Sequence, residues 1–203
     1  MQVVVIAISA VLFSVYGTSS TSRTCKGNIN NLHPTGQHHG GVAASNADVQ
    51  HDIPYLNKHK HCYQASADKH CIQASVIAAI ASRESRGGSL LDSTRGYGDG
   101  GRAWGIMQCD LAHSGLNCKA CPWDSCCHIE MMTAHILIPY IDRVKAKFPS
   151  WTQDQALQGG VAAYNFGVSN VKSWSHLDIG STGNDYSNDV IARAKHLHAA
   201  GWN

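Results

Sequence analysis

Charged residues are scarce in this sequence of 203 residues, and Asp, Glu, Lys and Arg together make up only 15% of it. The formal net charge is +2 with the histidines neutral, and the isoelectric point is about 8.1. So mild a positive balance does not indicate the basic surface that a nucleic-acid-binding protein needs. We therefore expect no nucleic acid among the partners of this protein.

Long apolar runs are also lacking, apart from one at the start. Residues 1–17 are apolar almost throughout, and the small residues Gly17, Thr18, Ser19 and Ser20 follow. The run is too short to span a bilayer, and this arrangement is typical of a secretory signal peptide. We expect cleavage somewhere between Gly17 and Ser22. We also expect residues 23–203 to form one domain of a secreted protein that has no membrane anchor.

All eight cysteines follow this first stretch, and an even number of them in a secreted chain indicates disulfides. Cys118-x-x-Cys121 followed by Cys126-Cys127-His128 has the spacing of a zinc-binding set. Disulfides explain these cysteines better in a secreted protein, so we expect no metal site and no cofactor. The thirteen histidines are interpreted as a solvated surface that gains positive charge as the pH falls through about 6.5.

The first half of the chain predicts one clear helix. Val76, Ile77 and Ile80 recur at the spacing of a helical face, with Ser75 as a candidate N-cap and Gly87-Gly88 as the stop. Residues 23–57 are rich in Gly, Asn and His without clear periodicity, so we expect an irregular segment there. Residues 90–104 are predicted to form a glycine-dense loop and residues 103–110 a single short strand.

The second half predicts three more helices after a cysteine-rich loop at residues 111–127. Apolar residues mark one stripe of the first helix at Met132, Ile136, Tyr140, Val144 and Phe148. Pro139 falls inside this helix and predicts a kink or a broken turn. Thr152-Gln153-Asp154-Gln155 is a capping box that opens a helix through Ala163, and a last helix is expected from Asp185 to Ala200, where Gly201 stops it. The fold class is therefore α+β, predominantly helical, with one small β element.

Glu84 is the first candidate for a catalytic group. It follows Ile77 and Ile80 by seven and four residues, which places it on the inward face of its helix. It also falls in the last turn, where the helix dipole disfavours a carboxylate. Burial and dipole both raise the pKa of such a carboxyl, as a general acid for glycoside cleavage requires. An ordinary surface glutamate is the alternative, and this position alone does not exclude it.

Two aspartates and an amide follow within 26 residues of Glu84. Asp99 lies in Gly96-Tyr97-Gly98-Asp99-Gly100-Gly101, where glycines permit sharp turns and a close approach to a ligand. If residues 103–110 are extended, Gln108 and Asp110 share one face and Cys109 points to the other, where it can form a cross-link. A plain turn aspartate and a merely solvated strand face are the alternatives.

Four stretches decide between these alternatives, namely Ser82-Arg83-Glu84-Ser85, Gly98-Asp99, Trp104-Gly105-Ile106-Met107-Gln108 and Ala163-Tyr164-Asn165. In order and spacing they resemble the goose-type lysozymes. The likeness extends over nearly the whole mature chain, through Cys25-Lys26-Gly27-Asn28, Phe148-Pro149-Ser150-Trp151-Thr152, Asp178-Ile179-Gly180-Ser181-Thr182 and Asp185-Tyr186-Ser187-Asn188-Asp189-Val190. The combination is highly specific, although any one stretch alone is not.

The resemblance implies a lysozyme-like fold with a small β element beside the active-site cleft. It also implies a secreted and bacteriolytic glycoside hydrolase. The sequence does not indicate an oligomeric state, so we expect a monomer by default. The family cleaves the β-1,4 bond between N-acetylmuramic acid and N-acetylglucosamine in peptidoglycan, with inversion. Glu84 matches its general acid, and Asp99 and Asp110 match the carboxylates that place or activate the attacking water. The substrate-binding positions of the family match Gln108, Tyr164, Asn165, Tyr186 and His113, and its disulfide matches Cys25 and Cys71. Core packing of the two tyrosines and helix capping by Asn165 are the alternative roles.

Two other functions fit parts of the same pattern. Lytic transglycosylases resemble this chain in the Glu-Ser, Gly-x-Met-Gln and Ala-Tyr-Asn stretches, but they close an anhydro ring instead of admitting water. The presence of Asp99 and Asp110 favours hydrolysis. A non-catalytic wall-binding protein is the third reading, and the presence of Glu84 together with both aspartates argues against it.

Overall fold

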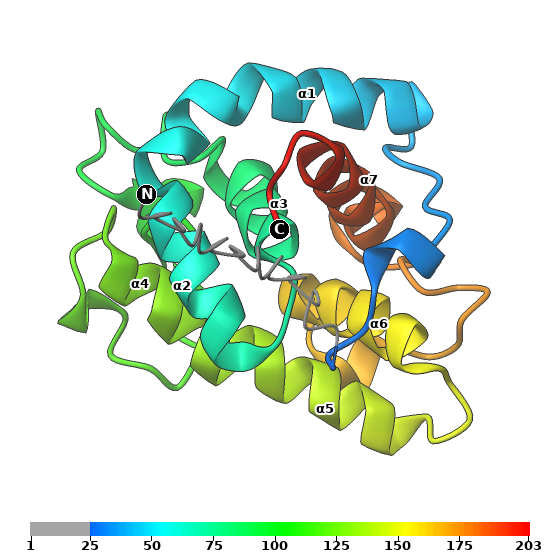
Figure 1. The fold of residues 1–203 in the computed structure, drawn as a ribbon. Coiled ribbons are helices and arrows are strands. Elements are labelled where there is room, and N and C mark those ends of the chain that lie inside the picture. Colours follow the sequence, from blue (N-terminus) through cyan, green and yellow to red (C-terminus); the bar gives the residue numbers. More distant parts are fainter. Residues whose placement is uncertain (1–24) are drawn as a thin grey trace, which may run out of the picture.

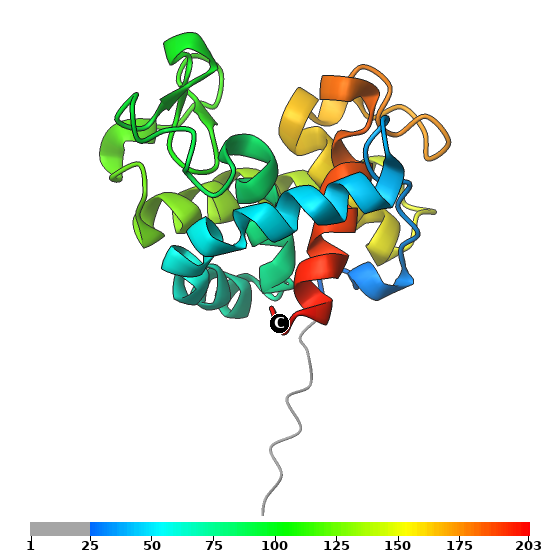
Figure 2. The same cartoon turned by 90° about the horizontal axis from the view of Figure 1, so that it is seen from above.

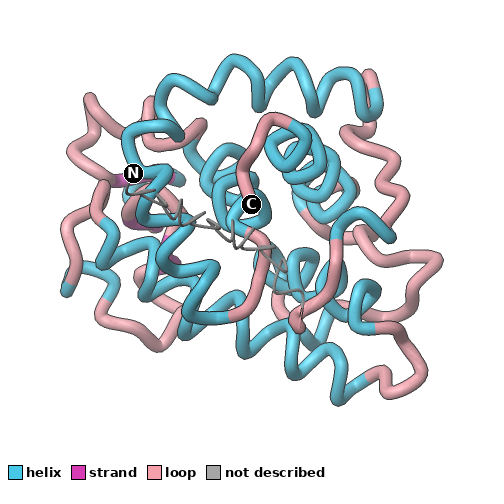
Figure 3. Tube along the Cα trace, in the orientation of Figure 1, coloured by secondary structure: helices cyan, strands magenta, loops and turns pink. Residues whose placement is uncertain are grey.

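The computed structural model describes residues 25–203, so the expected signal peptide and its cleavage site lie outside the described residues. Most of this part of the chain is helical, and the few strand residues gather in one place (Figures 1 and 3). The helices are α1 (Gly41–Leu56), α2 (Lys60–His70), α3 (Ala74–Ser85), α4 (Cys126–Met132), α5 (Ile138–Lys147), α6 (Gln153–Phe166) and α7 (Tyr186–Ala199). The strands are β1 (Tyr97–Gly98), β2 (Ala103–Trp104) and β3 (Cys109–Asp110).

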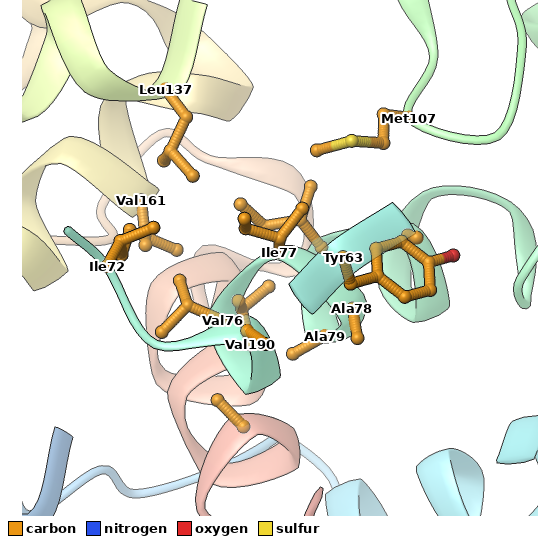
Figure 4. Packing of buried hydrophobic residues seen from close by; sticks show 14 of the residues in the cluster. Tyr63, Ile72, Val76, Ile77, Ala78, Ala79, Met107, Leu137, Val161 and Val190 are labelled. Carbon is orange, nitrogen blue, oxygen red and sulfur yellow. The ribbon is translucent and has the colours of Figure 1, made fainter. Parts of the chain in front are cut away.

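Helix α3 forms the centre of the core. Every residue from Ala74 to Ser82 is buried, because α1, α2 and α7 all pack against this helix. Figure 4 shows side chains of α3 surrounded by residues from other elements, among them Leu137, Val161 and Val190. The small and apolar residues of α3 permit this close packing on all sides. Glu84 therefore stands on the most enclosed helix of the fold.

The two ends of α3 test the sequence-based prediction differently. The expected N-cap at Ser75 is wrong: the helix begins at Ala74 after Gln73, and the buried hydroxyl of Ser75 has no partner among the described residues. The expected stop is confirmed. Arg86 has a φ of 52°, and its N–H donates to the carbonyl of Ser82 at 2.9 Å, which closes the helix with a left-handed cap.

Helix α1 overturns the expectation of an irregular segment over residues 23–57. Its buried positions Ser45, Val49, Asp52 and Leu56 follow the helical spacing. Two of the four are polar, so the segment shows no apolar periodicity. Asp52 is tolerated in this face because the Oγ of Ser82 donates to it at 2.7 Å and Arg193 lies 3.5 Å away.

The single strand expected over residues 103–110 is also wrong, because the segment folds back on itself. Strands β2 and β3 are antiparallel, with Ala103 opposite Asp110, and β1 pairs with the other edge of β2. A turn at residues 105–108 joins β2 to β3, and its ends Gly105 and Gln108 have φ of 80° and 51°. Gln108 therefore lies in a turn and not on a strand face beside Asp110. Cys109 points inward as expected.

The helices that follow the cysteine-rich loop largely agree with the helices predicted from the sequence. The chain breaks its α-helical pattern in a π-helical turn, η5 (Thr133–Leu137), and Pro139, which has no N–H to donate, follows in the first turn of α5. The capping box of Thr152 and Gln155 is present in both directions, and α6 continues three residues beyond Ala163. Helix α7 begins one residue after Asp185.

Four disulfides join all eight cysteines. The expected pair Cys25–Cys71 is confirmed. The other pairs are Cys62–Cys126, Cys109–Cys118 and Cys121–Cys127. The zinc-like spacing thus belongs to disulfides, which leave no thiolate to bind a metal. No helix within residues 25–203 has the length and apolar character to cross a membrane.

Candidate active site

A cleft of about 1000 Å³ lies between the sheet with its loops and the carboxyl end of α6. Figure 2 shows the sheet region and the segment between α6 and α7 as two projections on opposite sides of the central helices. The cleft brings together all but one of the predicted catalytic and substrate-binding residues. Those that line it are Glu84, Asp99, Gln108, Asp110, His113, Tyr164 and Asn165. Tyr186 is the exception, since it is buried and does not line the cleft.

Glu84 lies half-buried in the last turn of α3 and faces the cleft. Burial raises the pKa of this carboxyl to about 7 by penalising its charged form, although a hydrogen bond from Tyr186 and the charge of Arg83 act in the opposite direction. A carboxyl with this pKa is substantially protonated in mildly acidic and neutral solution. It can therefore donate a proton to a leaving group.

Tyr186 lies beneath Glu84. It is the first residue of α7, it is 1% exposed, and its Oη donates a hydrogen bond to Oε1 of Glu84. Burial raises the pKa of this phenol well above its usual value, and the neighbouring Glu84 adds to the effect. Tyr186 therefore stays protonated and orients the carboxyl of Glu84, so its geometry suits positioning and not contact with a sugar.

Asp99 and Asp110 carry their charge at the exposed side of the cleft. The guanidinium of Arg102 donates to Asp99 from Nε at 3.0 Å and from Nη2 at 2.9 Å, which lowers the pKa of Asp99. Slight desolvation opposes a lower pKa at Asp110, but the backbone N–H groups of Ala112 and His113 donate to it at 2.8 and 2.9 Å and lower the pKa overall. The cleft thus holds one carboxyl that is mostly protonated below about pH 7 and two whose lowered pKa values favour the ionised form.

The remaining predicted residues make structural contacts as well as lining the cleft. Gln108 folds back so that its Nε2 donates to the carbonyl of Gly105 at 2.8 Å. The Oη of Tyr164 donates to the carbonyl of Met107 at 2.7 Å, and Asn165 exchanges two hydrogen bonds with Thr182. His113 is exposed, with its Nδ1 3.1 Å from Oδ2 of Asp110.

A buried charge network behind the site could not be seen in the sequence. Arg83 forms ion pairs with Asp185 at 3.1 Å and Asp189 at 2.8 Å, on either side of Tyr186 in the chain. Arg193 also pairs with Asp189, at 3.0 Å, and reaches α1 through Asp52. The four-residue spacing of Asp189 and Arg193 predicts one ion pair on a helix, but the pairs with Arg83 and Asp52 have no local pattern. The network fixes α7 against α3 and so fixes Tyr186 under Glu84.

Comparison with known proteins identifies the family of this chain. The family model described as "Lysozyme g" matches residues 16–201. Lysozyme g of Gallus gallus is 38% identical over 187 residues, which cover 92% of this chain and 86% of that protein. The chain belongs to the lysozyme g family. Lysozyme G of Dromaius novaehollandiae is 36% identical over 213 residues, which cover 100% of this chain and 99% of that protein.

A longer protein also contains a segment similar to this chain. The glycine, glutamate and proline-rich protein of Lottia gigantea is 52% identical over 195 residues, but these are 90% of this chain and only 46% of that protein. Membership of the lysozyme g family confirms the expected lysozyme-like α+β fold and the expected class of enzyme, a glycoside hydrolase.

Proposed function

We propose that this enzyme hydrolyses the β-1,4 bond between N-acetylmuramic acid and N-acetylglucosamine in bacterial peptidoglycan, with inversion at the anomeric carbon. One observation carries the proposal: the raised pKa of Glu84, about 7, and the lowered pKa values of Asp99 and Asp110 occur in one cleft. Inverting glycosidases need one protonated and one ionised carboxyl with room for a water between them.

Each carboxyl has a role in this proposal. Glu84 donates its proton to the glycosidic oxygen as the bond to the anomeric carbon breaks. Asp99 and Asp110 hold a water on the opposite face of the sugar and accept its proton as its oxygen bonds to that carbon. Gln108, Tyr164, Asn165 and His113 line the path of the polysaccharide. Tyr186 keeps Glu84 oriented.

We further propose that residues 23–203 form one secreted domain that acts as a monomer. Four disulfides support secretion, because such bonds form and persist in oxidising compartments. Mass spectrometry of the natural product gives the cleavage site, and light scattering of the purified protein gives the oligomeric state. A start before Gly17 or a dimer would contradict these two statements.

Lysis of a Gram-positive wall suspension tests the activity. Wild-type protein should clear the suspension, and Glu84→Gln should abolish clearing while leaving the circular dichroism spectrum intact. Glu130→Gln is the matched control, because Glu130 is the other glutamate in the sequence and lies on α4 outside the cleft. Full clearing by Glu84→Gln would contradict the assignment of Glu84, and wall binding without clearing by the wild type would favour a binding protein.

The products separate hydrolysis from transglycosylation. Inversion of a β bond gives the α-anomer first, which NMR detects before mutarotation. Anhydro-muramyl ends in place of reducing sugars would identify a lytic transglycosylase. A β-anomer as the first product would contradict inversion.

A further inference from the structure

His128 is a fully buried histidine beneath the turn at residues 105–108. Its Nε2 accepts the backbone N–H of Met107 at 3.3 Å. Because Nε2 accepts, the proton of the neutral ring lies on Nδ1, which has no partner among the described residues. The ring also packs against Gly105, where an added Cβ would come within 2.4 Å of its Cε1. Histidine and glycine therefore fit each other closely at this turn.

Two other helices fasten the same turn. Ser85 of α3 donates from Oγ to the carbonyl of Ile106 at 2.7 Å, and Tyr164 of α6 donates from Oη to the carbonyl of Met107 at 2.7 Å. Ser85 directly follows Glu84 in the chain. Gln108 is the last residue of the turn, and Asp110 follows in β3. The position of the turn therefore sets the distance between Glu84 and the opposite side of the cleft.

Two disulfides fix the first turn of α4, which carries His128. Cys126 is joined to Cys62 of α2, and Cys127 is joined to Cys121 in the loop before α4. In addition, the Oγ of Ser125 accepts the backbone N–H of His128 at 3.2 Å. These bonds hold the Cys126-Cys127-His128 stretch in place, and with it the imidazole ring of His128. The stretch has no role in the proposed chemistry.

We propose that His128 is a positioning residue of the active site, whose imidazole accepts the N–H of Met107 and holds the 105–108 turn where Gln108 and Asp110 face the substrate. This inference rests on the proposed function, since it takes the cleft as the substrate site. The ring gains one hydrogen bond but leaves its buried Nδ1–H unpaired, so it adds little net stability. What it does fix is the direction of the Met107 N–H, and with it the shape of the turn.

Two variants of similar length separate this role from simple packing. His128→Gln places an acceptor oxygen within reach of Met107, whereas His128→Met fills a comparable volume and offers only the weak acceptor of its thioether. On soluble peptidoglycan fragments, we expect His128→Gln to keep kcat within about threefold of wild type. His128→Met should lose kcat toward the roughly hundredfold that an ångström-sized misplacement costs. Thr133→Val, which removes a buried hydroxyl of η5 outside the cleft, is the control for stability alone.

NMR of the free protein tests the hydrogen bond without any substrate. Nitrogen shifts of the wild type should show His128 neutral at pH 5 with its proton on Nδ1, because burial lowers its pKa to about 4. Amide exchange at Met107 should be slow in wild type and His128→Gln, and much faster in His128→Met. If His128→Met does not fold, His128→Asn replaces it, because its amide is too short to reach Met107.

The outcomes for His128 and for the proposed function can be told apart. Equal kcat in the Gln and Met variants, a proton on Nε2, or unchanged Met107 exchange in His128→Met would each overturn the role of His128. A wild-type protein that shows the expected tautomer and exchange but clears no wall would overturn the proposed function and keep the structural role.

Discussion

The phenolic hydroxyl of Tyr186 donates a hydrogen bond to the carboxyl of Glu84 and so joins the first residue of α7 to the last turn of α3. Burial raises the pKa of Glu84, whereas this hydrogen bond and the charge of Arg83 lower it. The resulting pKa of about 7 is therefore a balance between opposing effects. Each effect can be changed separately by mutation.

The pH dependence of lysis should follow the three carboxyls of the cleft. Activity requires Glu84 protonated, so it should fall as the pH rises through about 7. It also requires ionised Asp99 and Asp110, whose pKa values lie below the ordinary range, so activity should persist well into the acid range. Clearing rates measured from pH 3 to 9 at constant ionic strength test this profile. A rate that is flat across neutrality would contradict the role of Glu84.

Tyr186→Phe should move the alkaline limit of activity to higher pH. The substitution removes a hydrogen bond that lowers the pKa of Glu84. A bond worth about 1 kcal/mol corresponds to a shift of roughly 0.7 pH units. Tyr63→Phe is the matched control, because the hydroxyl of Tyr63 is buried without a partner in the described part of the chain. A shift toward lower pH in Tyr186→Phe, or an equal shift in both variants, would refute the assignment.

Glu84→Gln should stabilise the protein in neutral and alkaline solution. The folded-state pKa of Glu84, about 7, lies above its ordinary value of 4.5, so its favourable contribution is complete below pH 4.5 and is lost as the pH rises through 7. The neutral amide avoids burying a charge. A folded-state pKa of about 7 against 4.5 corresponds to about 3 kcal/mol, so the melting temperature of the variant should exceed that of the wild type by about 6–12 °C at pH 8, and by less at pH 4. An equal difference at both pH values would contradict this linkage.

Arg193→Met should strongly destabilise the fold. The substitution leaves the buried carboxylates of Asp189 and Asp52 without their shared cation. Breaking a buried ion pair in this way costs about 3–5 kcal/mol. Lys26→Met is the control, since it removes a partly exposed pair with Asp142 and should cost about 1 kcal/mol or less. Urea denaturation measures both free energies of unfolding.

Gly105→Ala should reduce both stability and activity, because its Cβ would clash with the ring of His128. Gly115→Ala is a close control. Gly115 has a similar φ, 72° against 80°, but none of the described residues lies within 4 Å of the position of its Cβ. The two variants share the backbone strain, so the difference between their free energies of unfolding isolates the clash. No difference between them would show that the ring moves aside freely.

The local signals of the sequence predicted several elements correctly. The capping box of Thr152 and Gln155 and the helical stop at Gly87 depend on residues that are close in the chain, so their chemistry is visible without a structure. The same holds for Glu84, whose burial follows from Ile77 and Ile80 on its own helix. Each of these predictions required only the period of a helix.

The failures share a different cause. Helix α1 buries Asp52, which is acceptable only because Ser82 and Arg193 meet it from other helices. The hairpin at residues 105–108 depends on a left-handed conformation at Gln108. Glutamine seldom adopts this conformation, so the sequence does not predict a turn there. The place of Tyr186 under Glu84 likewise depends on how α7 packs against α3. Tertiary contacts decide all three, and no local pattern records them.

The disulfide between Cys62 and Cys126 should make the protein more resistant to inactivation by proteases. It links the two ends of a long segment that contains α3, Glu84 and the whole sheet. A single cut anywhere between these cysteines therefore leaves both parts of the polypeptide in one covalent molecule. Within that segment, Cys109–Cys118 does the same for the exposed loop that carries His113. A nicked molecule can thus keep both sides of its cleft together where an unlinked chain would come apart.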